Sequence, residues 1–461
     1  MGKPKKSKKG SVPMPTVSVL KRTVTVELIQ TKEQEEELKE LGNLCSKLWN
    51  QVNYERRRQF FNGEHSVDIK GTYNKWYNEY KEKVGTITAQ QVLNKNNEAW
   101  SSFFSLLRAK KEEKLLLPFI KKINPPGYWK DKKKRKLIIV LRKDQYKIDK
   151  EKQEIELRHL GKFEDLKIRY KGEIYYRGEQ GRLEIIYNSM LRKWYAHITI
   201  KANERLDRKT GKWMKVPLTP KGNLVGGIDI GINNLLAVYI SDGTQVLIKT
   251  RVLKSISYYF MKLISMKQKL LSLYKQPFSN EIRRLYVKWK RELNTIIDAT
   301  VRKVVEFLYN KGVSLIKVGY PKNISQKKGN FLVANVWSYK QVMDKLRDVA
   351  EEHGITVEFV NEAYTSTTCP IHGNGCGKRV SRGLFKCTTS NKVFNADLVG
   401  AFNISIILSP NDGGVEGTTT RGIGISWGKT TPLVYTWTRG SGLVVPASYD
   451  SMRLKRIDQN L

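Results

Sequence analysis

The stretch from Leu224 to Val246, LVGGIDIGINNLLAVYISDGTQV, determines the type of fold that the second half of this chain adopts. It begins with an apolar strand that ends at Asp229, continues through a turn at Gly231 and Asn233, and returns as a second apolar strand into an Asp-Gly hairpin. A carboxylate at the end of a central strand can hold Mg²⁺, because this hard ion prefers oxygen ligands. Taken alone the pattern is weak, since turns favour the same residue types.

The segments after this hairpin alternate between helix and strand. Two long helical runs come first, and the second keeps helical spacing until Gly312 ends it. The segment GVSLIKVGYPKNISQ, residues 312–326, reads as a buried strand followed by a turn, and a helix from about Trp337 to His353 and the strand ITVEFVNEA follow. Strand hairpin, helix, strand, helix, strand is the order of an α/β domain with a mixed sheet, as in ribonuclease H.

The first half of the chain has a different pattern. VSVLKRTVTVELI, residues 17–29, alternates as a half-buried strand does, and from about Lys32 to Lys114 the apolar residues take helical spacing. Cys45 lies on the first of these helices and is expected to act as a small buried hydrophobe. Short alternating runs return from about Leu117 to Ala202. This order predicts a β-barrel-like domain that is interrupted by a helical one.

The charge of the chain points to a polyanionic partner. Its 461 residues include 84 Lys and Arg against 44 Asp and Glu, which gives a formal charge of +40. Self-repulsion of this size is relieved by nucleic acid, whose phosphates bind Lys and Arg in a salt-dependent way.

No stretch approaches the roughly 20 apolar residues that span a bilayer, and the start, MGKPKKSKKGSVPMP, lacks the apolar region of a secretory signal. We therefore expect a cytoplasmic protein with no membrane partner.

A cluster of metal-ligand residues lies in CPIHGNGCGKRVSRGLFKC. Cys369 and His372 form a C-x-x-H pair, and Cys376 and Cys387 follow. Four N and S ligands in a short loop are typical of a closed, tetrahedral structural zinc site. Ser390 stands where a standard zinc ribbon would have its fourth Cys, so His372 is expected to complete the set. The alternative is a loop of free thiols, which the ligand-like spacing makes less favourable.

A third motif is NADLVGAFNIS, in which Asp397 begins an amphipathic helix. An Asp in the first turn of a helix is favoured by the helix dipole and needs no other role. On this motif alone the structural explanation is sufficient. The case for a functional role comes from its combination with the two motifs before it.

The three motifs together resemble the RuvC-like nuclease of TnpB, the transposon-encoded RNA-guided endonuclease related to compact type V CRISPR effectors. The resemblance lies in GIDIGINN, in YTSTTC with its Cys/His loop, and in NADLVGAFNI, over about Leu224 to Leu408. KLWNQVNYERRR is also similar to the first recognition helix of that family. The resemblance implies that Asp229 and Asp397 are the first and third catalytic carboxylates, and that the Cys/His loop belongs to the target-nucleic-acid-binding module.

The resemblance also implies a division of the chain into domains, which makes it a multidomain α+β protein. We expect a basic flexible arm (1–15), a β-barrel wedge domain (16–31 and 116–205), a helical recognition domain (32–115), a linker (206–223), a RuvC/ribonuclease H-like α/β nuclease domain (224–363 and 393–408), an inserted zinc-binding module (364–392) and a disordered tail (409–461).

The chain departs from the family at the second catalytic carboxylate. The family has a Glu at the end of the strand in residues 312–320, where this chain has Val318, Gly319 and Tyr320. The next parallel strand should lie about 4.8 Å away, and Glu362 at its carboxyl end can reach back over one strand spacing. Some members of the TnpB and Fanzor families use a Glu relocated in this way.

Two other acids are less suitable as the relocated ligand. Glu358 should point to the same face as Glu362 but lies about 13 Å farther from the edge of the sheet. Glu306 lies on the preceding helix, too remote from the edge. A degenerate site without a second carboxylate is the remaining alternative.

The expected function is that of an RNA-guided, Mg²⁺-dependent DNA endonuclease. Asp229, Glu362 and Asp397 would hold two Mg²⁺ ions for phosphodiester hydrolysis, zinc would fold the Cys/His loop, and a guide RNA would select target DNA beside a short flanking motif. One alternative is a nuclease-dead RNA-guided DNA-binding repressor. Another is an actin-like ATPase, whose phosphate-binding hairpin resembles the segment around Asp229; the charge and the zinc loop argue against it.

Overall fold

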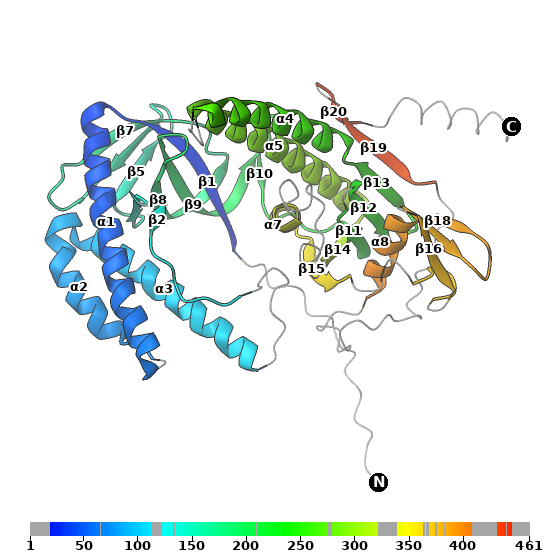
Figure 1. Cartoon of the computed structure of the whole chain (residues 1–461), viewed down its shortest axis with the longest axis horizontal. Helices are drawn as coiled ribbons and strands as arrows, with labels where there is room; N and C mark the ends of the chain where they lie inside the picture. The colour runs from blue at the N-terminus through cyan, green and yellow to red at the C-terminus, as the bar shows by residue number, and fades with distance from the viewer. Residues whose placement is uncertain are drawn as a thin grey trace, which may run out of the picture.

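Among the described residues, the computed structural model has two large sheets, one in each half of the chain (Figure 1). The first sheet is built from segments before residue 216, and the second from segments after residue 223. The structure describes residues 19–64, 66–112, 122–131, 134–208, 210–231, 233–274, 279–320, 339–362, 365, 368–373, 376–381, 383–407, 431–438 and 440–444. The predicted basic arm at residues 1–15 lies outside these ranges.

The N-terminal sheet has eight antiparallel strands. Its hydrogen-bonded order is β4-β8-β9-β1-β7-β6-β5, and β10 pairs with β9. Between the strands as described, β4 and β5 are not paired, so this sheet has two ends where a closed barrel would have none. The strands are β1 (Leu20–Ile29), β4 (Ile138–Leu141), β5 (Tyr146–Asp149), β6 (Glu154–Leu157), β7 (Leu166–Lys171), β8 (Tyr176–Asn188), β9 (Lys193–Leu206) and β10 (Trp213–Lys215).

Three helices are inserted between β1 and the rest of this sheet (Figure 1). Thr31 begins the first with a capping box, since its side chain accepts from the Gln34 N–H and Gln34 returns the bond. Cys45 is buried in the core that the helices share with the sheet, as predicted. The elements are α1 (Lys32–Gln59), the π-helical turn η1 (Phe60–Glu64), α2 (Ile69–Val84), α3 (Thr86–Lys111) and the small ribbon of β2 (Lys130–Asp131) and β3 (Lys134–Arg135).

The C-terminal sheet is mixed, as the sequence predicts. Its order is β15-β14-β11-β12-β13-β19-β20, with β14 parallel to both β11 and β15 and with β12 antiparallel to β11. The strands are β11 (Leu224–Asp229), β12 (Asn234–Ile240), β13 (Gln245–Lys249), β14 (Val313–Tyr320), β15 (Thr356–Asn361), β19 (Leu433–Thr438) and β20 (Gly442–Val444).

Helices cover both faces of this sheet. On one face, α4 (Arg251–Leu273), α5 (Asn280–Asn310) and α7 (Tyr339–Glu352) share a core with Leu236 and Val238 of β12. On the other face, α8 (Ala396–Ile406) packs through Phe402 on Ala237 and Tyr239. Because alternate residues of a strand point to opposite faces, the core of this half is divided between the two helical layers.

One prediction about these segments is wrong. We expect a disordered tail, but β19 pairs in parallel with β13 and buries Val434. The predicted linker at 206–223 contains the strand β10, Trp213–Lys215, which pairs with β9. Each strand forms where an existing sheet offers unpaired backbone groups. Residues 409–430 and 445–461 of the tail lie outside the described ranges.

A search of the described helices for membrane spans found none that is long and apolar enough to cross a bilayer.

Candidate functional site

Asp229 ends β11 on the face that α8 covers. Gly227, two residues before it, lies against the α8 backbone, where an added Cβ would meet the Ala401 carbonyl oxygen at 2.1 Å. Asp229 points to the same face, because residues two apart in a strand share a side. An added Cβ at Gly400 of α8 would lie 2.9 Å from Asp229 Oδ2. The helix therefore approaches this carboxylate closely, and glycine at position 400 leaves room for it.

Glu362 follows the last residue of β15. The predicted position of this strand is confirmed, because β15 pairs in parallel with β14 from Leu315–Thr356 to Tyr320–Asn361. Val360 packs on Ile404 of α8, so Glu362 also lies on the α8 face. An ideal Cβ at Gly319 would lie 3.3 Å from Glu362 Cβ. The side chain of Glu362 therefore begins beside the end of β14, where Val318, Gly319 and Tyr320 provide no carboxylate.

Asp397 is held at the start of α8 by the cap of that helix. Asn395 is the N-cap residue, and its side chain accepts hydrogen bonds from the backbone N–H groups of Asp397 and Leu398 at 3.0 and 3.2 Å. The Asn234 amide at the start of β12 donates to Asp397 Oδ2 at 2.6 Å. Asn234 Oδ1 is buried and, within the described part of the chain, has no hydrogen-bond partner. A buried acceptor of this kind suits a site that receives a cation.

The three carboxylates interact through their charges. Desolvation raises the pKa of Asp229 well above its ordinary value, and the charges of Glu362 and Asp397 raise it further. Desolvation also raises the pKa of Glu362 to about 7. Carboxylates that burial and mutual repulsion drive toward their protonated forms are stabilised when a metal ion neutralises them. The arrangement therefore fits divalent cations with oxygen ligands, and these residues are the ones that could hold Mg²⁺.

Two further residues border the carboxylates and were missed by the sequence reasoning. Arg379 NH2 on β16 (Gly377–Ser381) lies 3.9 Å from Asp397 Oδ1, and its charge lowers the pKa of Asp229. Tyr339 begins α7; burial, then the charges of Glu362 and Asp229, raise the pKa of its phenol. Arg379 stands among many basic residues in the sequence, so no local signal distinguished it.

Glu358 and Glu306, the two acids that the sequence makes less suitable than Glu362, lie away from the carboxyl edge of the C-terminal sheet. Glu358 lies within β15, opposite Lys317 of β14 in the register. Glu306 lies on α5 and its charge acts on His353, at the far end of α7 from Tyr339. Neither contributes to the charge environment of Asp229, whose pKa responds to Glu362, Asp397 and Arg379.

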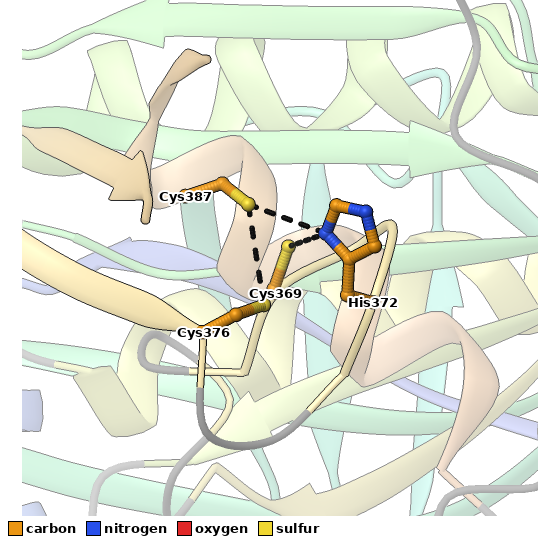
Figure 2. Close-up of side chains that lie close together, drawn as sticks. All are labelled: Cys369, His372, Cys376 and Cys387. Atoms are coloured by element: carbon orange, nitrogen blue, oxygen red, sulfur yellow. Dashed lines mark hydrogen bonds between the residues drawn. The ribbon is translucent and has the colours of Figure 1, made fainter. Parts of the chain in front are cut away.

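The four predicted zinc ligands come together in space (Figure 2). One ligand atom from each of Cys369, His372, Cys376 and Cys387 lies within 4.8 Å of the others. His372 Nδ1 is 3.2 Å from Cys387 Sγ and 3.8 Å from Cys369 Sγ. Among the described residues this is the one group of three or more His, Cys, Asp or Glu side chains that are close enough to share a metal ion, and the three carboxylates do not form such a group. Three thiols and one imidazole match tetrahedral Zn²⁺.

The backbone around this cluster is arranged to favour a thiolate. The Ser390 N–H donates to Cys387 Sγ at 3.4 Å, and hydrogen bonding from Ser390 lowers the pKa of Cys387 to about 6. Cys369 and Gly373 exchange two backbone hydrogen bonds, which form a tight turn around His372. Ser390 thus contributes a backbone donor where a standard ribbon has a fourth Cys. Such donors to sulfur are typical of structural zinc sites.

The cluster is joined to the carboxylates through α8. The small sheet of β16, β17 (Leu384–Cys387) and β18 (Val393–Asn395) leads directly into that helix. Phe385 and the three cysteines of the cluster pack with Ala396 and Val399, which flank Asp397. The Asn403 amide donates to the carbonyl oxygens of Thr365 and Thr368 at 2.6 and 2.8 Å. The Cys/His loop and Asp397 are therefore held by the same helix, α8.

Comparison with known proteins shows the family of this chain. Residues 203–325 match the OrfB_IS605 family, described as probable transposase, and residues 339–404 match the Cas12f1-like TNB domain. The TnpB-like protein ORF457 of Acidianus two-tailed virus is 41% identical over 401 residues, which cover 83% of this chain and 86% of that protein. The CRISPR-associated endodeoxyribonuclease Cas12f1 of Sulfoacidibacillus thermotolerans is 33% identical over 106 residues, 23% of this chain and 25% of that protein.

The fold has a counterpart among solved structures. A cryo-EM structure of a Cas12f1–sgRNA–target DNA complex superposes with a TM-score of 0.50 at 17% identity, over 82% of this chain and 83% of that one. The class of protein is therefore that of the Cas12f1-like fold, a mixed α/β architecture with a cysteine cluster suited to metal. Within this class, the chain belongs to the family of TnpB-like proteins.

Proposed function

We propose that this protein is an RNA-guided, Mg²⁺-dependent DNA endonuclease of the TnpB type. The observation that carries the proposal is the interaction of Asp229, Glu362 and Asp397, three acids from separate segments. After burial, the charges of Glu362 and Asp397 raise the pKa of Asp229. All three lie toward the α8 face at the carboxyl edge of a mixed sheet. If these acids belonged to structural ion pairs, a cation would lie beside each of them. Among the described residues, one ion pair involves the three acids, and it joins Arg379 to Asp397 at 3.9 Å.

The three carboxylates would hold Mg²⁺, which supplies an activated water and neutralises charge on the scissile phosphodiester. Asn234 fixes one oxygen of Asp397 through its amide, so that the other oxygen faces Arg379. The partly exposed guanidinium of Arg379 can bind a phosphate oxygen of the strand to be cut. Tyr339 stays protonated, since its pKa is raised, and its hydroxyl can donate a hydrogen bond at the site.

The guide and target would be held by the basic N-terminal half. The formal charge of +40 suits the phosphates of a guide RNA and a heteroduplex. A cavity of about 720 Å³ between α1, α2 and β3 offers cations and stackable rings to a nucleic acid. Its cationic and aromatic lining residues are Lys47, Tyr54, Arg58, Lys75, Trp76 and Arg135. This is where we place contacts to the guide and to the short motif that flanks the target.

The Cys/His cluster would bind structural Zn²⁺. Metal analysis of purified protein should find about one zinc per chain, as a closed four-ligand site holds. Cys369→Ser should lose that zinc. Cys45→Ala is the matched control, because Cys45 is buried in the N-terminal core away from the cluster and should leave the zinc content unchanged. Zinc retained by Cys369→Ser would contradict the assignment.

Cleavage by the protein copurified with its own RNA tests the proposal directly. A DNA duplex matched to the guide is supplied with Mg²⁺, and wild type is compared with Asp229→Ala and Glu362→Gln. We expect wild type to cut, and both variants to bind the target with loss of cutting of at least about 10³-fold. Asp344→Asn is the control that should cut normally, because the ion pairs of Asp344 stay within α7.

The outcomes separate the alternatives. Normal cutting by Glu362→Gln would show that another acid supplies the second carboxylate. Target binding without cutting by wild type would show a nuclease-dead RNA-guided binding protein, in which the missing Glu at the end of β14 is a true loss. Absence of guided binding would overturn the proposal as a whole.

A further inference from the structure

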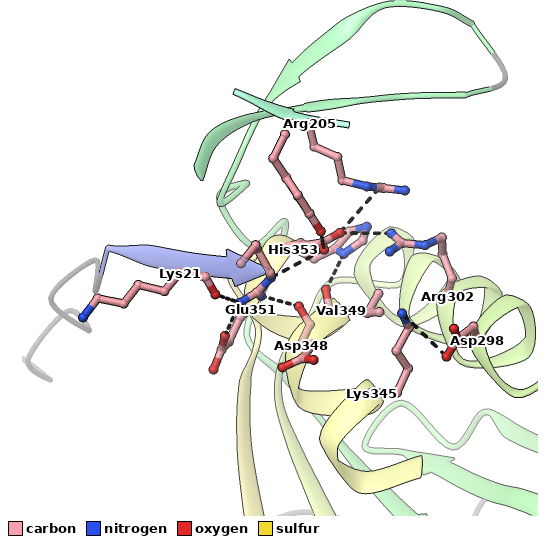
Figure 3. Close-up of polar contacts among 12 residues, drawn as sticks. Lys21, Arg205, Asp298, Arg302, Lys345, Asp348, Val349, Glu351 and His353 are labelled. Atoms are coloured by element: carbon pink, nitrogen blue, oxygen red, sulfur yellow. Dashed lines mark hydrogen bonds and ion pairs between the residues drawn. The ribbon is translucent and has the colours of Figure 1, made fainter. Parts of the chain in front are cut away.

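Glu352, at the last position of α7, is a buried acid surrounded by arginines. Arg302 NH1 lies 3.0 Å and Arg205 NH1 3.5 Å from its Oε2, and Arg22 Nε lies 3.7 Å from its Oε1. The Tyr176 hydroxyl donates to Oε1. In Figure 3, Arg205 comes from the top of the view and Arg302 from the helix at the right. We call Glu352 and these four partners the Glu352 clamp.

The partners come from both halves of the chain. Arg22 lies on β1, Tyr176 on β8 and Arg205 on β9, all in the N-terminal sheet, whereas Arg302 lies on α5. Arg22 also contacts α7 through Glu351 Oε2 at 3.1 Å and the Asp348 carbonyl oxygen at 2.5 Å. The clamp therefore ties three strands of the N-terminal sheet to the end of one helix in the C-terminal half.

Burial alone would raise the pKa of Glu352. The charge of Arg302, the hydrogen bond from Tyr176 and the charge of Arg205 outweigh it and hold that pKa below its ordinary value. Glu352 is thus charged, and its position is set by groups on several elements at once. A buried carboxylate with several cationic partners favours one arrangement of those partners, because a displacement would weaken its pairing.

The turn after Glu352 is held equally closely. The Leu218 N–H donates to the Glu352 carbonyl oxygen at 2.9 Å. Gly354 has φ +68, and an added Cβ there would meet the Leu218 carbonyl oxygen at 2.1 Å. This turn leads straight into β15, which ends beside Glu362. The end of α7 and the start of β15 therefore cannot move independently of the segment at Leu218.

The clamp acts on one of the three carboxylates. Glu362 lies about 20 Å along β15 from the clamped turn, and a paired strand transmits a shift along its length. Asp229 ends β11 and Asp397 begins α8, and none of the clamp partners lies on those elements. The connection that runs from the N-terminal sheet through the clamp to the start of β15 therefore leads to Glu362.

We infer that Glu352 is a positioning residue that sets the place of Glu362 in the metal site from the N-terminal sheet. The inference rests on the proposed function, in which Glu362 is a metal ligand and the N-terminal half holds the guide. The relocated carboxylate is then the ligand whose position depends on the half of the protein that binds RNA. Assembly of the metal site becomes coupled to that binding.

Metal binding by the full chain with its copurified RNA tests the inference. The probe is Mn²⁺, followed by electron paramagnetic resonance, in wild type, Glu352→Gln, Glu362→Gln and the double variant. We expect Glu352→Gln to weaken Mn²⁺ binding by roughly 3- to 30-fold, the size of effect that residues remote from a site have on it. We expect no additional weakening when Glu362→Gln is already present, because the two residues act through one ligand.

The matched control is Asp344→Asn. Asp344 is an acid of α7 whose ion pairs, to Lys340 and Arg347, stay within that helix, so Mn²⁺ affinity should stay unchanged. If Glu352→Gln does not fold, as a thermal melt would show, Tyr176→Phe replaces it, since this change removes one hydrogen bond and no charge. Weaker Mn²⁺ binding by Tyr176→Phe is expected in that case.

Each outcome decides a separate point. Unchanged Mn²⁺ affinity in folded Glu352→Gln, or in Tyr176→Phe where that variant is used, overturns the positioning role and leaves the proposed function intact. Additive losses in the double variant also overturn it, since Glu352 would then act on the fold in general. If Glu362→Gln binds Mn²⁺ with the same affinity as wild type, Glu362 is not a ligand, and the inference is overturned with that role.

Discussion

At the scale of single residues, Gly319 and Glu362 form a complementary pair. Gly319 stands near the end of β14, where an added Cβ would lie 2.4 Å from Ile404 Cδ1 and 3.3 Å from Glu362 Cβ. The space that a side chain would use there is occupied by Glu362 from the next strand and by α8. The two positions explain each other, because a carboxylate on β15 needs a glycine on β14.

This pairing gives a prediction for Gly319→Ala. The new methyl group must displace Ile404 and Glu362, so we expect the free energy of unfolding to fall by about 1–3 kcal/mol. Gly226→Ala is the matched control in the neighbouring strand β11. A Cβ there would meet Val313 Cγ1 at 3.6 Å, an ordinary contact, and stability should change by less than about 1 kcal/mol. Urea denaturation measures both, and equal losses in the two variants would refute the argument.

Glu362 also gives a prediction about pH. Its pKa is raised from 4.5 to about 7 in the folded protein, so the folded state binds this proton more tightly than the unfolded chain does. The free energy of unfolding of the Mg²⁺-free protein should therefore fall as pH rises from about 4.5 to 7. Mg²⁺ affinity should rise over the same range, since the bound form needs the carboxylate without its proton.

The measurement compares Glu362→Gln with wild type in Mg²⁺-free buffer. The amide carries no charge, so the variant should be more stable by about 3 kcal/mol at pH 8 and by almost nothing at pH 4.5. Unfolding in urea at several pH values gives this difference directly. A difference that does not vary with pH would show that Glu362 is not shifted as described.

At the scale of elements, β19 has a role that its sequence does not suggest. It pairs in parallel with β13 through Val246–Leu433 to Ile248–Tyr435 and covers the edge of the C-terminal sheet. Val434 is buried with Leu247 and Phe402, and Leu443 of β20 joins the opposite core. The two strands thus contribute to both cores of this half.

Truncation tests the role of β19 and β20. A chain that ends after residue 430 exposes the β13 edge and the apolar residues beneath Val434, so we expect a fall in Tm of several degrees or more and aggregation on heating. The control chain ends after Val444 and keeps both strands, and its Tm should match that of the full chain. Equal melting of all three chains would show that the strands add no stability.

At the scale of the whole molecule, the charge of +40 predicts strongly salt-dependent binding of RNA. The logarithm of the affinity should fall linearly with the logarithm of the salt concentration, with a slope set by the number of phosphate contacts. Arg58→Ala should reduce the slope by about one unit, since Arg58 lines the cavity between α1 and α2. Lys143→Ala is the control, because Glu179 already pairs with Lys143 at 2.8 Å. A slope that Arg58→Ala leaves unchanged would remove that cavity from the RNA path.

Much of the fold and of the candidate site could be predicted from local sequence. The apolar runs around Asp229 and in residues 312–320 predicted a mixed sheet, since period-2 and period-3.6 patterns record which faces are buried. The spacing of Cys369, His372, Cys376 and Cys387 predicted a metal cluster, because ligands that are close in sequence fold into one loop. The family assignment also followed from the motifs, and it is confirmed.

What the sequence determined by itself is therefore the set of elements, the family and the ligand types, because each depends on residues that are neighbours along the chain. Tertiary structure decided which acids share one charge environment. Glu362 and Gly319 are related only by the pairing of β14 with β15, and Arg379 reaches Asp397 only because α8 folds back on the small sheet. The strand pairing of residues 433–438 and the Glu352 clamp join segments far apart in the chain, and no local pattern records a contact of that kind.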